Sequence, residues 1–282
     1  MDDLVSTEWL DAQRGAPDLV LLDATFHALE PERDAAAEFA AGHIPGARHL
    51  DLKTLCDPDD PLPSMLPPAE LFADRMRALG IGPESGVVLY DAAAHHTAAR
   101  AWWVMRHFGL RRIALLDGGF AKWRAEGRPI ETGTSAPAPA APPLALSDDP
   151  ATLRTKQQMV ANLTTRRETV IDARSPTRFT GEEGDPRAGV APGHIPGSYN
   201  VRYSALFAAD GTWLREAALR NAFRAAGVDL ARPLVMTCGS GTTAAVLAFG
   251  AHLLGRDDVA LYDGSWSEWG ADPDTPKATG PA

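Results

Sequence analysis

The two halves of this 282-residue chain carry the same short motifs in the same order. Gly-His-Ile-Pro-Gly stands at 42–46 and again at 193–197, Leu-Leu-Asp-Ala at 21–24 matches Val-Ile-Asp-Ala at 170–173, and Leu-Asp-Gly-Gly at 116–119 matches Tyr-Asp-Gly-Ser at 262–265. The partners stay about 150 residues apart, which indicates a duplicated domain. The length also suits roughly two domains, each large enough to bury its own core.

A linker and the fold class follow from the pattern between and within the halves. Residues 133–143 are dense in proline, alanine and small polar residues, so we expect domains at 1–133 and 149–282 joined by an extended linker at 134–148. Short apolar runs alternate with helical patterns, which predicts an α/β fold of two tandem domains, each a mainly parallel sheet flanked by helices. Strands are expected at 19–22, 87–90, 113–116, 170–171, 234–236 and 259–262, and helices at 68–79, 217–226 and 246–254.

Charge and cysteine content limit the partners. Lysine and arginine total 27 against 37 acidic residues, a net charge of −10, so nucleic acid is not an expected partner and a bound anion needs a few local arginines. With only Cys56 and Cys238, neither a disulfide framework nor a four-cysteine zinc site is possible, which favours a reducing compartment. The acidic start and the absence of a long apolar run predict a cytoplasmic protein without membrane contact.

A cysteine follows the strand expected at 234–236. Ligands of parallel α/β sheets collect at the carboxyl ends of strands, and there the chain reads Thr-Cys-Gly-Ser-Gly-Thr-Thr at 237–243. Gly239 and Gly241 permit unusual backbone conformations, so several N–H groups can surround an anion, and the positive end of the next helix favours the Cys238 thiolate as a nucleophile. The alternative is a buried apolar cysteine without chemistry.

The first half lacks this loop. Asp91 stands in the place of the cysteine without alternating glycines, so we expect a catalytically silent domain in which Asp91 caps the next turn. His95 and His96 are adjacent but have no third ligand nearby in the sequence, so they are expected on a surface loop and no metal site is predicted.

These motifs together resemble tandem rhodanese-domain sulfurtransferases over nearly the whole chain. The loop from Cys238 to Thr242 is uncharged and is similar to that of the 3-mercaptopyruvate sulfurtransferases, whereas thiosulfate sulfurtransferases carry basic residues after the cysteine. The resemblance implies Cys238 as nucleophile, Gly239, Gly241, Thr242 and Thr243 as its loop, and Ser240 as a proton relay. It implies no cofactor, a thiol acceptor such as thioredoxin or a small thiol, and a monomer.

The resemblance also implies a substrate-binding pair, Arg178 and Arg187, for the carboxylate and ketone oxygens of 3-mercaptopyruvate. Planar guanidinium forks suit such oxygens. The rival interpretation is an ion pair with Glu182, Glu183 or Asp185. Arg174, two residues after Asp172 at a strand end, is expected to pair structurally.

Two positions depart from the resembled pattern, and other functions stay open. Ser64 replaces a histidine and Lys53 an acid that accompany the loop serine in related enzymes, so that relay does not carry over. Cys56 is interpreted as incidental. A thiosulfate sulfurtransferase and a non-enzymatic sulfur carrier remain alternatives. A phosphatase is disfavoured because no arginine follows the cysteine loop.

Overall fold

The computed structural model describes residues 1–135 and 137–282, so position 136 of the expected linker lies outside the described residues. The chain divides into two compact units. The first comprises 1–58, 66–148 and 207–213, and the second comprises 59–65, 149–206 and 214–282. The described residues of 134–148 form neither helix nor strand.

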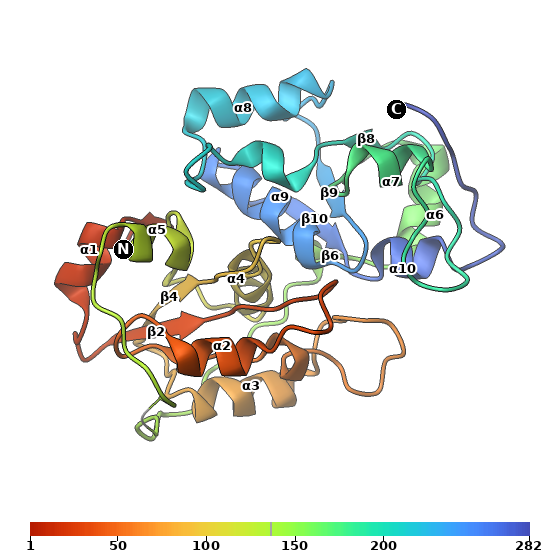
Figure 1. Ribbon diagram of the computed structural model, residues 1–282. Coiled ribbons are helices and arrows are strands. Elements are labelled where there is room, and N and C mark those ends of the chain that lie inside the picture. Colours follow the sequence, from red (N-terminus) through yellow and green to blue (C-terminus); the bar gives the residue numbers. More distant parts are fainter. Residues whose placement is uncertain (136) are drawn as a thin grey trace. The chain divides into compact units, whose positions relative to one another are not determined.

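Each unit contains a five-stranded, entirely parallel sheet (Figure 1). The two sheets have the same topology, β1-β5-β4-β2-β3 and β6-β10-β9-β7-β8, which confirms the duplication. The strands are β1 Leu4–Val5, β2 Leu19–Asp23, β3 Arg48–His49, β4 Gly86–Tyr90, β5 Ile113–Leu116, β6 Leu153–Arg154, β7 Thr169–Asp172, β8 Tyr199–Asn200, β9 Leu234–Thr237 and β10 Val259–Tyr262.

α-Helices flank both sheets, and the described residues also form three short 3-10 helices. The α-helices are α1 Thr7–Gln13, α2 Ala35–Ala41, α3 Ala69–Ala78, α4 Ala98–His107, α5 Gly119–Ala125, α6 Lys156–Thr165, α7 Pro176–Thr180, α8 Glu216–Ala225, α9 Thr242–Leu253 and α10 Ser265–Trp269, and the 3-10 helices are η1 Leu52–Thr54, η2 Pro150–Thr152 and η3 Tyr203–Leu206.

The central strands confirm the sequence prediction, and their burial explains why. Every residue of β4 and of β9 is buried, as expected for parallel strands covered on both faces. Helix α9 begins at Thr242, four residues before the predicted start at 246. Gly241, with φ of 79°, turns the chain into the helix, so Thr242 and Thr243 belong to its first turn and not to the loop.

Among the described residues, no helix combines the length and apolar character needed to cross a membrane.

Candidate active site

Cys238 lies directly after β9, at the carboxyl edge of the second sheet. Asp172, the last residue of β7, pairs in register with Thr237, so Cys238 is the first residue beyond the strand. The side chain is a free thiol and only 2% exposed. The predicted position of Cys238 after the strand is therefore confirmed. The burial expected under the alternative interpretation is observed as well.

The Ser265 hydroxyl fixes the shape of the cysteine loop. Its oxygen accepts hydrogen bonds from the backbone N–H groups of Cys238 at 3.2 Å and Gly241 at 3.1 Å, and donates to the Tyr262 carbonyl at 2.8 Å. Ser265 is fully buried, and its φ of 49° lies in the left-handed region. This contact was not predicted from the sequence, although Ser265 belongs to the repeated motif at 262–265.

The start of α10 also holds the carbonyl side of the loop. Trp266 N donates to the Cys238 carbonyl and Ser267 N to the Gly239 carbonyl, each at 2.9 Å. The loop is thus attached to α10 through both donors and acceptors, which fixes it before any ligand binds.

Four backbone N–H groups around the cysteine remain available. Within the described part of the chain, the amides of Gly239, Ser240, Thr242 and Thr243 have no hydrogen-bond partner. Thr242 Oγ1 is likewise buried without a partner. Since these groups surround the N-terminus of a 12-residue helix, they can stabilise negative charge there. That these N–H groups surround an anion stays a prediction; Cys238 N and Gly241 N take no part, because both donate to Ser265.

Gly239 lies close to the guanidinium groups of two arginines. A Cβ atom added there would lie 2.8 Å from Arg187 Nη2 and 3.6 Å from Arg178 Nη2. Its φ is not among the left-handed values, so the prediction that Gly239 supplies a special backbone conformation was wrong, whereas Gly241 does so. The structure therefore brings both predicted arginines to the cysteine loop.

A buried carboxylate holds the two arginines. Asp185, whose side chain is 1% exposed, accepts from Arg178 Nη2 at 2.5 Å and from Arg187 Nε at 2.9 Å. Arg187 Nη1 also donates to the Gly239 carbonyl at 2.8 Å, while Arg178 Nε is buried and unpartnered. The ion pair weighed as the rival interpretation exists, yet one carboxylate balances two guanidinium groups. One positive charge is left over beside the loop.

Arg174 pairs structurally, as predicted. Its guanidinium donates to Asp172 through Nε at 3.1 and 3.0 Å and through Nη2 at 2.6 Å, and both side chains are 2% exposed. Nη2 also donates to the Gly193 carbonyl at 2.8 Å. Arg174 is therefore part of the domain core.

The equivalent edge of the first sheet has different chemistry. Asp91 accepts from Ala93 N at 3.2 Å and from Ala98 N at 2.8 Å at the start of α4, which confirms its predicted capping role. Desolvation by burial raises the pKa of Asp91 to about 7. His96 lies in the loop between β4 and α4, as predicted, and is half-buried; its ring stacks on Phe207 at 3.7 Å, and burial lowers its pKa to about 4.

Three further positions were singled out in the sequence: Cys56, Ser64 and Lys53. The Cys56 thiol donates to the Lys53 carbonyl at 3.0 Å, and burial raises its pKa, so the unreactive thiol form is favoured. Ser64 has a left-handed φ of 63° and falls in the second compact unit, whereas Lys53 falls in the first.

Two parallel α/β domains, one of them with a cysteine loop before a helix, define a recognisable class. The model of the rhodanese-like domain matches residues 6–126 and 155–272, and the chain belongs to the rhodanese family. It is 43% identical to human 3-mercaptopyruvate sulfurtransferase over 94% of this chain and 91% of the relative, and 40% identical to chicken thiosulfate sulfurtransferase over 94% and 92%. The crystal structure of SseA from Escherichia coli, titled as a 3-mercaptopyruvate sulfotransferase, has a TM-score of 0.85 and 33% identity over 95% of this chain and all of that one.

Proposed function

We propose that this protein is a 3-mercaptopyruvate sulfurtransferase that works through a persulfide on Cys238. The observation that carries the proposal is the pairing of an uncharged cysteine loop with two guanidinium groups held beside it by one buried carboxylate, that of Asp185. 3-Mercaptopyruvate carries its charge several atoms from the transferable sulfur, so it needs cations beside the loop and not within it.

The reaction is a double displacement. The Cys238 thiolate attacks the substrate sulfur, an S–S bond forms and the carbon–sulfur bond breaks. The electron pair moves to carbon 3 of the leaving group, which departs as the enolate of pyruvate and takes up a proton. An acceptor thiolate or cyanide then attacks the outer sulfur of the persulfide and releases the Cys238 thiolate.

The site residues act on different parts of this sequence. Arg178 and Arg187 hold the carboxylate and ketone oxygens, and the enolate forms against their surplus positive charge. The unpartnered amides at Gly239 and Ser240 stabilise the persulfide anion. The half-exposed Ser240 hydroxyl relays the proton, and the first domain is catalytically silent because Asp91 occupies the cysteine position.

The two free thiols support a proposal for the cellular compartment. Cys56 and Cys238 are both unpaired, which supports action in a reducing cytoplasm. The acceptor is a thiol, either thioredoxin or a small thiol, and the working form is a monomer.

The functional domains are 1–133 and 149–282, joined by the linker at 134–148.

Thiosulfate is the second candidate donor. The similarity to thiosulfate sulfurtransferases supports it, as do the guanidinium groups that come within about 4 Å of the Gly239 side-chain position. Thiosulfate, however, is a dianion that brings charge directly to the loop, where Gly239 and Ser240 supply no cation.

The test is kcat/KM of the purified protein with 3-mercaptopyruvate and with thiosulfate, using cyanide as the common acceptor. A preference for 3-mercaptopyruvate of at least about tenfold is the expected result. A preference for thiosulfate overturns the choice of donor. Activity with neither donor favours a sulfur carrier, which takes up one sulfur without repeated release of pyruvate.

A further inference from the structure

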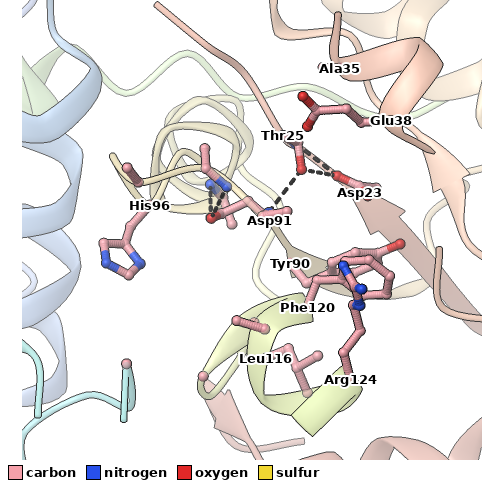
Figure 2. A pocket seen from close by; sticks show the side chains of 18 of the residues that line it. Asp23, Thr25, Ala35, Glu38, Tyr90, Asp91, His96, Leu116, Phe120 and Arg124 are labelled. Carbon is pink, nitrogen blue, oxygen red and sulfur yellow. Dashed lines mark hydrogen bonds between the residues drawn. The ribbon is translucent and has the colours of Figure 1, made fainter. Parts of the chain in front are cut away.

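The first compact unit contains a cavity of about 790 Å³ at the carboxyl ends of β2, β4 and β5. All of its lining residues belong to that unit. Its lining includes five aromatic residues and three carboxyl groups, those of Asp23, Glu38 and Asp91 (Figure 2). The aromatic lining residues are Phe39, Tyr90, Phe120, Phe207 and Trp213.

The repeat shows which residues of the two domains correspond at this place. Asp23 ends β2 opposite Tyr90 of β4, as Asp172 ends β7 opposite Thr237 of β9. Two residues later, the backbone N–H donates to Oδ1 of the aspartate at 2.9 Å in both domains, from residue 25 in the first and residue 174 in the second. The backbones therefore match, and threonine stands where the second domain has arginine.

In the second domain this place is filled by the guanidinium of Arg174. The group is bound by the Asp172 carboxylate and the Gly193 carbonyl, and its central carbon lies 4.6 Å from the centre of the Trp266 ring. An acid, a carbonyl and an aromatic face together form a complete guanidinium site.

The first domain has the same surroundings without the guanidinium. Asp23, Gly42 and Phe120 correspond to Asp172, Gly193 and Trp266, and all three line the cavity. The side chain between them is Thr25, whose hydroxyl donates to Asp23 and accepts from Ala92 N at 2.9 Å. A threonine is too short to reach the place of an arginine head group, so the volume stays open.

Of the three carboxyl groups in the cavity, Glu38 is paired with Arg33, which also lines the cavity, at 2.8 Å. Within the described residues, no lysine or arginine pairs with Asp23 or Asp91, and burial raises the pKa of both groups. Arg124 also lines the cavity; this exposed residue lies over the Phe120 ring, 5.8 Å from the ring centre (Figure 2). The polar neighbours of Asp23 are Thr25, Tyr90 and His49, and none of them is a guanidinium or an ammonium group.

We propose that this cavity binds a guanidinium or amidinium group, with Asp23 as its counter-ion. The second domain supplies the same arrangement to its own arginine. The rest of the cavity, which is lined by Tyr90 and Trp213 among others, accepts the apolar part of the ligand to which the cationic group is attached.

Titration calorimetry with benzamidine and with benzamide tests the proposal, because the two molecules match in shape and differ in charge. We expect one equivalent of benzamidine to bind at least tenfold more tightly than benzamide. Asp23→Asn should weaken benzamidine binding tenfold or more, and Asp74→Asn, an exposed acid outside the cavity, should leave it unchanged. Equal binding of both probes, or no effect of Asp23→Asn, overturns the proposal.

A second variant keeps the test independent of how Asp23→Asn folds. Thr25→Arg places the second domain's arginine in the first domain, so it should abolish benzamidine binding and raise the melting temperature. Unchanged benzamidine binding in Thr25→Arg shows that the probe sits elsewhere and overturns the assignment.

The source of the group is distinguished by two further titrants. Agmatine stands for a small free guanidine, and the peptide Gly-Arg-Gly for an arginine side chain of a protein. Binding of agmatine alone assigns the cavity to a metabolite, and binding of the peptide assigns it to a protein arginine. Binding of neither overturns guanidinium recognition.

Discussion

The carboxyl ends of β9 and β4 show what separates the two halves of this duplicated chain. After β9 the chain places a thiol, spare N–H groups and two guanidinium groups held by Asp185. After β4 it places Asp91, whose carboxylate is used up in capping α4. One fold thus presents either a nucleophile or an acid at the same position. The difference lies in the few residues after each strand and not in the sheets themselves.

The largest expected effect is the loss of the nucleophile. In Cys238→Ser a neutral hydroxyl cannot form a persulfide, so sulfur transfer from 3-mercaptopyruvate should fall at least about a thousandfold. Circular dichroism should show an unchanged fold. Retained turnover would remove Cys238 from the mechanism.

The contrast between the two domains would be wrong if a cysteine in the first domain could replace Cys238 as the nucleophile. Asp91→Cys in the Cys238→Ser background should restore no activity, because the glycine loop and the arginine pair are absent there. Measurable pyruvate release from this double variant would show that position alone, without the loop, is sufficient.

The next effect concerns stability at the matched positions 174 and 25. Arg174→Ala leaves the buried carboxylate of Asp172 unpaired and should lower the free energy of unfolding by about 3–5 kcal/mol. Thr25→Ala removes only a hydroxyl and should cost about 1 kcal/mol. Urea denaturation measures both, and equal losses would contradict the inferred difference between the two edges.

Substrate affinity is the third expected difference. Arg187→Ala removes a fork of charge-assisted hydrogen bonds and should lower kcat/KM for 3-mercaptopyruvate by about 10- to 100-fold, chiefly through KM. Arg111→Ala is a matched control, because this exposed arginine of the first domain donates its hydrogen bonds to the backbone carbonyls of Arg106 and Leu110. An unchanged KM in Arg187→Ala would show that the carboxylate is held elsewhere.

The smallest expected effect is the pH dependence that Asp91 gives to the free energy of unfolding. Its pKa of about 7 lies above the value in the unfolded chain, so the native state keeps the proton longer and stability falls as pH rises from about 4 to 7. Asp91→Asn lacks this fall. Relative to wild type, its free energy of unfolding should improve by about 2 kcal/mol between pH 5 and pH 8. A constant difference would refute the raised pKa.

Sequence alone predicted the central strands and the cysteine position because both depend on local patterns. Apolar runs such as 87–90 and 234–236 are buried on both faces, and strand, glycine loop and helix are contiguous around Cys238. The two-residue strands β1, β3, β6 and β8 were missed because so short a pairing leaves no periodicity. The role of Asp185 was open because it depends on two arginines converging on one carboxylate.

The cavity was missed for a different physical reason. It exists because Thr25 is smaller than Arg174. An unfilled volume of this kind cannot be recognised from the residues of a single segment. Aligning Asp-Ala-Thr at 23–25 with Asp-Ala-Arg at 172–174 would have revealed the substitution, since the repeat supplies its own reference.

The Ser265 hydroxyl, shared by the amides of Cys238 and Gly241, gives the loop two populations of exchangeable protons. Those two amides should exchange with deuterium only when α10 separates from the loop. The amides of Gly239, Ser240, Thr242 and Thr243 should exchange quickly in the free protein and slow down when a persulfide anion occupies their centre. The sulfur-loaded state would then be recorded in the backbone itself, without any rearrangement of the loop.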